Sequence, residues 1–573
     1  MLRRMTTPRQ EQQDTGPARD DHPRRPDRRP GGRPLWRRRA RRTADAPRPS
    51  APRRRGRTWA ALGGLALTLT LVPPADAGGG DGLARQLDRV LADPRLDGGA
   101  VSVVVRDADS GELRYARHPK TRLMPASNTK LVTSAAAMEL LGPDHRFRTE
   151  VLADGRRVGG VLHGDLYLRG TGDPTMLAED YDRLAAELAD AGIRRVTGRL
   201  IGDDTRFDRE RLGRGWAADD ESAYYSSQIS PLTVAPDTDY DAGTVRVAVS
   251  PGAEPGDRPT VTLTPPNDYV TVDVTARTVA ADEPDTLSVD REHGGNTLTV
   301  RGDIPVDAKP TTSWVSVWEP TGYAVAVFAD ALAEHGVRVT GGPRVGRAAP
   351  KDAEVLAVHR SMPLRELLVP FLKLSNNNHA EVLTKAIGYA TSGEGSWRAG
   401  LAAIERFLAD QGVDTATLRQ VDGSGLSRMN LLPSEALATL LTSVRDKPWF
   451  DDWQAALPVA CAEERMVGGT LRDRMCGTAA EGNARAKTGS LTGASALSGY
   501  VTDADGRELV FSVVLNGYLA DSVKDIEDAV VVTLAEHRAD GGGEGARPAG
   551  PTSGARTAGP AGLECSWVKP NGC

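Results

Sequence analysis

The sequence lacks an apolar run long enough to cross a membrane as a helix. The apolar stretch WAALGGLALTLTLV, residues 59–72, has fourteen residues, whereas a spanning helix needs about 20. An arginine-rich leader precedes it, and Ala75-Asp76-Ala77 follows it as an A-x-A pattern typical of a signal-peptidase site. We therefore predict that residues 58–77 form the apolar part and cleavage site of a secretory signal, cut after Ala77. The alternative is an uncleaved anchor, in which case the leader is the chain's membrane contact.

Motifs for metal binding are also missing. Neither CxxC nor HExxH occurs, and the nine histidines are scattered without ligand spacing. Cysteine is scarce, with only Cys461, Cys476, Cys565 and Cys573 present. An even number in an exported chain permits two local disulfides, 461–476 and 565–573, among three possible pairings. Because the ligand motifs are missing, we expect no metal, and we expect no other cofactor.

Lysine is absent from residues 1–57, which hold nineteen arginines against six acidic residues, a net charge of +13. Residues 78–573 carry 53 basic and 70 acidic residues, a net charge of −17. An acidic body offers no basic face for nucleic acid. A basic flank before an apolar run is typical of a segment that stays in the cytoplasm during export. We therefore expect no nucleic-acid partner, and an exported body in the cell envelope or secreted.

No internal repeat is evident, and a chain of 573 residues is too long for one hydrophobic core. Residues 1–57, rich in Arg and Pro, are typical of disorder, and residues 539–573 have the composition of a flexible tail. Strands are predicted at 100–106, 113–117, 484–491, 496–502 and 508–516. Helices are predicted at 128–141, 378–389, 397–410, 434–444 and after residue 521.

This order predicts an α/β (α+β) fold, with an antiparallel sheet built from both ends of the chain and covered by helices. We expect a main domain made of residues 83–150 and 359–538. Residues 151–358 differ, because short strand-like runs with Gly, Pro and Asp turns dominate there. They predict one or two β-rich domains inserted into the main domain.

Three short strings carry the chemistry, in the order SNTK (127–130), SNN (375–377) and KTG (487–489). Ser127 and Lys130 are three residues apart, so on a helix their side chains share one face. A serine hydroxyl is a poor nucleophile until a base takes its proton, and a lysine can be that base only when it is neutral. Each string alone has a plain structural reading, such as a helix cap beside a solvated lysine. Their combination indicates a serine acyl-transfer site.

Ser375 and Asn377 lie at a predicted loop-to-helix junction. Ser375 can relay a proton between Lys130 and a leaving amine, while Asn377 can hold a substrate amide. Lys487 is a candidate for the second cation that favours the neutral form of Lys130.

The third string lies on a predicted strand. Lys487, with the hydroxyls of Thr488 and Ser490, can bind a terminal carboxylate. Gly489 allows the backbone to come close to a ligand. The N–H of Ser490 is expected to join that of Ser127 as an oxyanion hole.

These strings, with DGSGLSR (422–428), VLHGDLYLRGTGDP (161–174) and the strand at 499–501, resemble the D-alanyl-D-alanine carboxypeptidase/endopeptidase family. Its members are serine DD-peptidases, the class C low-molecular-mass penicillin-binding proteins. The resemblance extends from about residue 83 to 536. Asn376 stands where Asp is common and Ser490 where Thr is common, and both retain hydrogen-bonding ability.

The resemblance implies a β-lactamase/transpeptidase-like catalytic domain carrying two inserted domains. It implies an acyl-enzyme on Ser127, peptidoglycan stem peptides as substrates and inhibition by β-lactams. Asp422 and Arg428 are then expected to be structural. Asp220 and Tyr225 are candidates for binding the free-amine end of a diaminopimelate-type side chain; a surface acidic loop is the plain alternative.

Two other functions are compatible with the strings. A β-lactamase shares the first half of the mechanism but needs a base for fast deacylation, and no Glu-containing loop of the class A type is evident. The long insertion also argues against it. A non-catalytic wall-binding or β-lactam-sensing protein is expected to have an incomplete site, whereas every named group is present here.

Overall fold

The computed structural model describes residues 81–539. The predicted leader, signal sequence and, apart from Ala539, the tail lie outside the described residues, as do Cys565 and Cys573. In the part that is described, no helix combines the length and the apolar character needed to cross a membrane.

The main domain is built on an antiparallel sheet with the strand order β16-β17-β18-β1-β2. Its strands are β1 (Ala100–Asp107), β2 (Leu113–Arg117), β16 (Arg485–Leu491), β17 (Ala494–Thr502) and β18 (Glu508–Asn516). β1 pairs with β18 from Ala100 opposite Asn516 to Asp107 opposite Leu509. The first and last parts of the body therefore meet inside one sheet, which confirms the predicted architecture.

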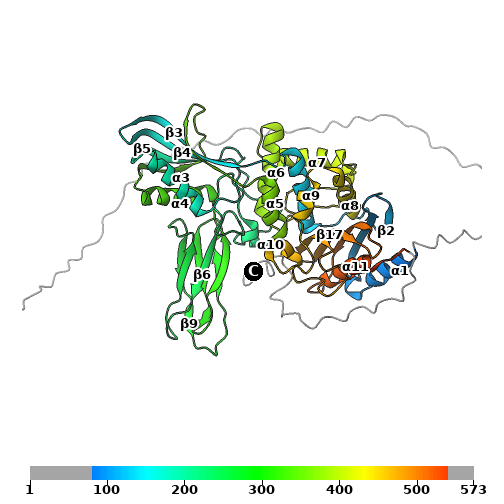
Figure 1. The fold of residues 1–573 in the computed structure, drawn as a ribbon. Helices are drawn as coiled ribbons and strands as arrows, with labels where there is room; N and C mark the ends of the chain where they lie inside the picture. Colours follow the sequence, from blue (N-terminus) through cyan, green and yellow to red (C-terminus); the bar gives the residue numbers. More distant parts are fainter. Residues whose placement is uncertain (1–80, 540–573) are drawn as a thin grey trace, which may run out of the picture. The chain divides into compact units, whose positions relative to one another are not determined.

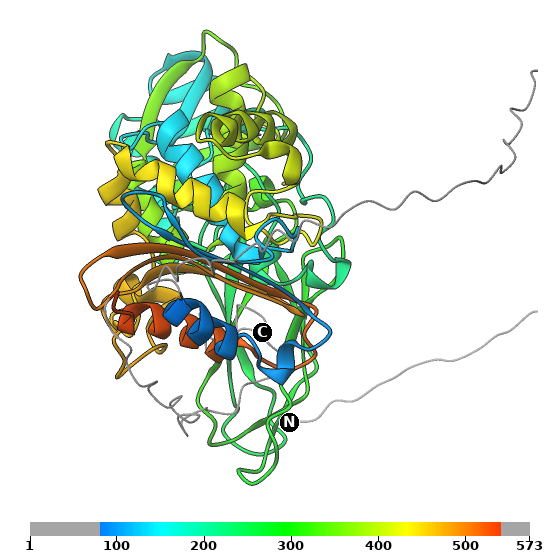
Figure 2. The ribbon, with the colours of Figure 1, turned by 90° about the vertical axis from the view of Figure 1, so that its right-hand side faces the viewer.

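Helices cover both faces of this sheet (Figure 2). α1 (Asp81–Val90) and α11 (Lys524–Glu536) share a core with Val103 of β1. The next residue, Val104, belongs to a second core on the opposite face. Successive side chains of a strand point to opposite faces, so an unbroken run of valines suits a sheet covered on both sides.

The second core is formed largely by helices. These are α2 (Thr129–Leu140), α5 (Leu364–Lys373), α6 (Asn377–Ser392), α7 (Trp397–Asp410), α8 (Ser434–Ser443) and α9 (Phe450–Ala455). α2 contacts all five of the others, and its residues from Thr129 to Met138 are buried. Because α2 is buried on all sides, the side chains of its first turn are kept from bulk water. The predicted helices are found, and α5 and α9 are additions.

The inserted residues begin with a mixed sheet, ordered β14-β5-β4-β3-β15. Its strands are β3 (Arg148–Val158), β4 (Val161–Gly170), β5 (Arg195–Asp203), β14 (Arg338–Val345) and β15 (Glu354–Arg360). Two helices, α3 (Ala178–Asp190) and α4 (Pro320–Glu334), contact this sheet and share its core (Figure 1). The prediction of β-rich domains for residues 151–358 did not include these helices.

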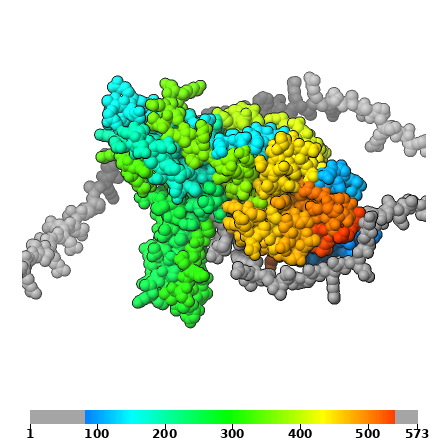
Figure 3. Space-filling model, in the orientation of Figure 1, coloured from blue at the N-terminus to red at the C-terminus, as the bar shows by residue number. Residues whose placement is uncertain are grey.

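A second set of inserted strands forms three small sheets, β13-β6-β7, β10-β11-β8 and β12-β9. Their bounds are β6 (Thr244–Ser250), β7 (Thr260–Thr264), β8 (Thr271–Val274), β9 (Arg277–Val279), β10 (Ser288–Arg291), β11 (Thr297–Arg301), β12 (Asp303–Pro305) and β13 (Thr311–Ser316). The inserted residues, cyan and green in Figure 3, gather beside the yellow and orange residues of the main domain. The sequence boundaries of these domains stay a prediction.

A segment of short turns connects α9 to β16. It contains α10 (Arg465–Gly468) and the 3-10 turn η7 (Gly469–Leu471). A disulfide joins Cys461 to Cys476 and closes a loop around both. This is one of the two local pairings that the sequence permits.

Candidate active site

Ser127 lies in a 3-10 turn, η2 (Ala126–Asn128), and α2 begins just after it at Thr129. It is therefore in the turn that leads into the helix, just before the helix predicted at 128–141. Ala126 has a positive φ of 46°, a conformation that residues other than glycine rarely adopt. Such backbone outliers cluster at functional sites.

Lys130 points from the first turn of α2 toward Ser127, and the distance from its Nζ to the Ser127 Oγ is 2.7 Å. The same nitrogen donates to the Asn377 side-chain oxygen at 2.6 Å and to the Ser424 carbonyl at 3.0 Å. Lys130 has no exposed surface. A hydroxyl with an amine at hydrogen-bond distance is the geometry that activates a serine nucleophile.

Ser375 and Asn377 reach the same point from the start of α6. Ser375 has a positive φ of 59°, which turns the chain sharply just before the helix. Asn377 links two parts of the chain, because its side chain accepts from Lys130 and donates to the Tyr225 carbonyl at 2.8 Å. Its predicted role was to hold a substrate amide. In this structure both ends of its own amide are bound to protein groups.

β16 brings the third string to the site. Lys487 is fully buried, and its Nζ donates to the Ser375 Oγ at 2.8 Å. Gly489 lies so close to η2 that a Cβ there would come within 3.0 Å of the Ser127 nitrogen, so a side chain at this position has no room. The buried Ser490 Oγ has no hydrogen-bond partner among the described residues, and Ser490 lines a pocket. An unsatisfied buried hydroxyl in a pocket wall can serve a ligand.

A cavity of about 300 Å³ opens beside Ser127, between two walls. The core wall comes from the main domain: Ser127, Leu374, Ser375, Asn376, Asn377, Gly425, Leu426, Arg428, Ser490, Leu491 and Thr492. The inserted wall comes from the segment after β5: Gly215, Ala217, Asp219, Asp220, Tyr224, Tyr225 and Asp241. Residues of the first two strings thus line one cavity with Ser490, which follows the third string, and with both candidates for amine binding.

Comparisons with known proteins agree with this geometry. Residues 83–537 match the model of the D-Ala-D-Ala carboxypeptidase 3 (S13) family. The D-alanyl-D-alanine carboxypeptidase of Actinomadura sp. (strain R39) is 46% identical over 542 residues, which cover 91% of this chain and 99% of the relative. The chain belongs to the S13 family of D-Ala-D-Ala carboxypeptidases.

Solved structures extend the likeness to the fold. Penicillin binding protein 4 (DacB) of Haemophilus influenzae superposes with a TM-score of 0.69 at 25% identity, covering 78% of this chain and 98% of that protein. A second structure of that protein, in complex with a β-lactam, matches with a TM-score of 0.62 at 24% identity. The predicted family and fold are therefore confirmed, and this chain is a D-Ala-D-Ala carboxypeptidase.

Two buried carboxylates shape the loop 422–428 of the carboxypeptidase. Glu381, from α6, accepts hydrogen bonds from the backbone N–H groups of two loop residues, the second being Ser424. Asp422 accepts from two N–H groups further along the loop. These bonds fix the Ser424 carbonyl, which is a partner of Lys130. The supporting position predicted for Asp422 agrees with these contacts, whereas no sequence motif indicated Glu381.

Burial raises the pKa of both carboxyls. The pKa of Glu381 rises to about 7, first because of burial and second because of the negative charge on Asp422. The pKa of Asp422 is raised by burial, against the opposing effect of its hydrogen bonds. Trp397 donates to Glu381 at 2.7 Å, and Trp216 of the inserted segment donates to Asp422 at 3.1 Å. Burial and the charge on Asp422 both favour the protonated form of the Glu381 carboxyl.

Asp220 and Tyr225 meet in the inserted wall of the pocket, where the Tyr225 hydroxyl donates to Asp220 at 2.8 Å. Both side chains are half-buried, and the neighbouring Asp219 is exposed. Burial and then the charge of Asp220 raise the pKa of Tyr225, so the phenol stays protonated and remains a donor. On the core wall, Arg428 donates to the Thr492 carbonyl at 2.9 Å. The inserted wall therefore offers negative charge to a ligand.

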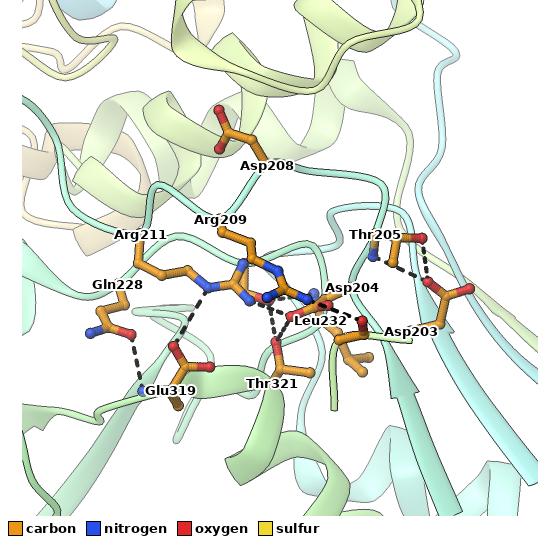
Figure 4. A network of polar contacts seen from close by, with 12 residues as sticks. Asp203, Asp204, Thr205, Asp208, Arg209, Arg211, Gln228, Leu232, Glu319 and Thr321 are labelled. Atoms are coloured by element: carbon orange, nitrogen blue, oxygen red, sulfur yellow. Dashed lines mark hydrogen bonds and ion pairs between the residues drawn. The ribbon is translucent and has the colours of Figure 1, made fainter. Parts of the chain in front are cut away.

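A polar network anchors residues 204–228, the inserted segment that follows β5 and carries most of the inserted wall, to the start of α4 (Figure 4). Asp204, just after β5, pairs with Arg211 and accepts from Thr321 at 2.9 Å. The Arg211 Nε lies 3.8 Å from a Glu319 carboxylate oxygen, and the Glu319 N–H donates to the Gln228 side chain at 3.0 Å. The beginning and the end of the segment are therefore both held next to the start of α4.

The disulfide loop supports β16 through a hydroxyl. Thr488 donates to the Thr470 hydroxyl at 2.9 Å, and Thr470 lies in η7, inside the loop closed by Cys461 and Cys476. Thr488 and Ser490 are two residues apart on the strand, so both side chains lie on the same face. No sequence motif indicated Thr470, because the contact joins segments that do not share a pattern.

A further buried amine lies near Ser375. Lys373 donates to the Leu457 carbonyl, and burial, helped by the charge of Arg485, lowers the pKa of Lys373 to about 7.

Within residues 81–539, no cluster of three or more His, Cys, Asp or Glu side chains has the arrangement of a metal site.

Proposed function

We propose that Ser127 is the nucleophile of the carboxypeptidase and Lys130 its base. Neutral Lys130 takes the proton of the Ser127 hydroxyl, and Oγ attacks the carbonyl carbon of the penultimate D-Ala. The C–N bond to the last D-Ala then breaks, and the proton returns to the departing amine through Lys130 and Ser375. A water molecule, giving up a proton to the same base, hydrolyses the ester on Ser127. The 2.7 Å distance between Lys130 and Ser127 is the observation that carries this proposal.

The third string binds and stabilises the reacting end of the substrate. Lys487 and the hydroxyls of Thr488 and Ser490 hold the terminal carboxylate, and the buried, unpartnered Ser490 Oγ supports this role. The backbone N–H groups of Ser127 and Ser490 receive the oxyanion, which the close approach at Gly489 favours.

The other end of the substrate lies against the inserted wall. We propose that Asp220, with Tyr225, binds the ammonium group of a diaminopimelate-type side chain in the peptidoglycan stem peptide. A half-buried carboxylate beside an exposed one favours a cation over a neutral group. When the leaving amine belongs to a second stem peptide, the same steps give endopeptidase activity.

β-Lactams are proposed to acylate Ser127 and to leave slowly. A Haemophilus protein of this fold has been seen with a β-lactam, and the strings that surround Ser127 are complete here. The substrate is outside the cytoplasm, so we also propose that the leader exports the protein to the cell envelope or beyond, as a cleaved signal or as an anchor.

Mass spectrometry after incubation with penicillin tests the nucleophile. The expected result is one adduct, on the peptide that contains Ser127, and its absence from Ser127→Ala. Release of D-Ala from a diaminopimelate-containing pentapeptide and cleavage of a crosslinked dimer measure the two activities on the same samples. An adduct on another residue would overturn the assignment, and rapid sustained turnover of nitrocefin would indicate a β-lactamase instead.

A further inference from the structure

The inserted wall is held from behind by the second set of inserted strands. Glu221 directly follows Asp220 in the chain. Its carbonyl accepts from Arg291 at 2.9 Å and from the Ser316 hydroxyl at 2.5 Å. The Ser316 N–H also donates to the carbonyl of Ser222 at 3.0 Å. Residues of strands β10 and β13 therefore hydrogen-bond to the backbone next to the proposed amine-binding carboxylate.

Arg291, the last residue of β10, is at the centre of this junction. One nitrogen of its guanidinium donates to the carbonyls of Glu292 and Gly295, at 2.9 and 2.6 Å, which ties the group to its own hairpin. The other donates to the Glu221 carbonyl and, at 3.1 Å, to the Glu221 carboxylate. The side chain of Arg291 is 2% exposed. A buried guanidinium with fixed donors holds its partners in one geometry.

The Glu221 carboxylate is also bound from the turn after β10. The Gly294 N–H donates to it at 2.9 Å, and the His293 Nδ1 lies 3.3 Å from its other oxygen. Four groups of the second set of strands thus converge on a single glutamate. None of the residues of these strands lines the pocket.

Fixing Glu221 also restrains pocket residues that precede it and follow it in the chain. On one side Asp220 is its immediate neighbour and accepts from the Tyr225 hydroxyl. On the other side the carbonyl of Tyr225 accepts from Asn377 of the core wall. The short segment from 220 to 225 is therefore fixed near its start by Arg291 and at its end by the main domain.

We propose that Arg291 is a positioning residue for substrate selection: by fixing Glu221, it holds Asp220 and Tyr225 where they recognise the ammonium group of the stem-peptide side chain. This inference rests on the proposed function, since it requires Asp220 to bind the amine. The second set of inserted strands then contributes to the choice of substrate and not to bond cleavage.

The test uses the folded protein and two peptides ending in D-Ala-D-Ala, which differ only in whether the side-chain amine of the preceding residue is free or acetylated. For the native protein we expect a higher kcat/KM for the free-amine peptide. Arg291→Met should reduce this preference about 10-fold, mainly through KM, because a misplaced charge loses much of its contribution. Arg291→Lys, which retains the charge, should restore part of the preference. Arg301→Met is the matched control, because Arg301 of β11 forms an exposed pair with Asp290 and is not among the residues that line the pocket.

The rate of penicillin acylation, measured on each variant, reports whether the core wall is intact. If Arg291→Met does not fold, Ser316→Ala removes a single bond to the Glu221 carbonyl and is expected to lower the preference by a smaller factor. A preference that Asp220→Asn abolishes but Arg291→Met and Ser316→Ala retain would overturn this inference alone. Absence of any preference in the native protein, or its survival in Asp220→Asn, would overturn the proposed amine site and this inference with it. Equal slowing of both peptides in Arg291→Met would show a merely structural role.

Discussion

The two walls of the pocket are built in different ways. In the core wall, Ser127 and Ser490 are each 5% exposed, and the lysines behind them, Lys130 and Lys487, are not exposed at all. In the inserted wall, Asp219 is exposed and its neighbour Asp220 is only half-buried. The helices that carry parts of the core wall, α2 and α6, belong to the large hydrophobic core of the main domain, whereas the inserted wall is held by polar contacts to strands and helices of the insertion.

This difference suits two tasks. Breaking a peptide bond needs donors and a base held within a fraction of an ångström, in a site where water does not weaken their charges. Recognising a charged end of a substrate needs a complementary charge but tolerates solvent around it. Changes to the core wall should therefore slow every substrate, and changes to the inserted wall should alter the choice between substrates.

The largest effect is expected at the core wall, from Lys130→Ala. Removing a member of a catalytic unit should lower kcat/KM by at least ~10³-fold. Because the proposed base acts on Ser127 and not on the side chain of the substrate, the free-amine and acetylated peptides should lose activity by the same factor. Steady-state release of D-Ala measures both losses.

Lys120→Ala, at an exposed lysine before η2, is the control for this variant. Its two rates should stay within about twofold of the native rates, as is usual for surface substitutions. A Lys130→Ala enzyme that kept its activity, or lost it for a single peptide, would break the division between the walls.

A loss of stability is expected when the disulfide behind the core wall is removed. Replacing both Cys461 and Cys476 by Ser opens a loop whose ends are 15 residues apart. The chain-entropy model assigns about 3 kcal/mol of unfolding free energy to a loop of that length. Urea unfolding, followed by tryptophan fluorescence, should show this decrease. Adding a reductant should destabilise the native protein by the same amount and leave the double variant as it was; equal unfolding of both proteins without reductant would refute the estimate.

The comparison also separates what sequence could predict from what it could not. The strings around Ser127, Ser375 and Lys487 were found because each is local, and their wide separation is bridged by a fold whose strands have clear patterns. Glu381 and Arg291 were missed because their roles depend on which distant backbone they meet, and neither lies in a motif. Such contacts follow from tertiary packing and leave no period in the sequence.

The missed helices of the insertion differ from these residues, because a local signal was present. In α3, Tyr181, Leu184, Ala185 and Leu188 are buried and recur at intervals of three and four residues. This spacing is typical of an amphipathic helix. The prediction for the insertion followed the short strand-like runs on either side of this segment. It therefore left out the helix, although the helical spacing of apolar residues is present in the sequence.

An effect that depends on pH is expected from Glu381→Gln. The pKa of the buried Glu381 rises to about 7 in the folded protein, against an ordinary value near 4.5. Between these values the folded protein retains a proton that the unfolded chain has released, so the free energy of unfolding falls as the pH rises through this window. One pKa unit corresponds to about 1.4 kcal/mol, and part of the shift comes from the charge of Asp422, whose own pKa is also raised, so we expect a decrease on the order of 2 kcal/mol.

Urea titrations at several pH values between 4.5 and 7.5 measure this dependence. The difference in unfolding free energy between the native protein and Glu381→Gln should shrink as the pH rises and level off above about 7. Glu405→Gln, on an exposed position of α7, is the control and should show a constant difference. Since Glu381 fixes the Ser424 carbonyl that meets Lys130, the variant should also slow both peptides alike. A constant difference for Glu381→Gln would contradict the raised pKa.

The smallest effect is expected from Thr470→Val, and it sharpens the comparison most. Thr488 now donates to Thr470; once Thr488 donates to the terminal carboxylate of a substrate, Thr470 can turn its own hydrogen toward the Thr488 oxygen. Loss of one such hydrogen bond costs about 1 kcal/mol, or roughly fivefold in KM. The loss should be confined to peptides with a free terminal carboxylate, and their C-terminal amides should be spared. Thr470→Ser should restore the native KM. If acid and amide were slowed equally, Thr470 would only support the strand; a selective effect would mean that each wall recognises one end of the substrate, the core wall its carboxylate and the inserted wall its amine.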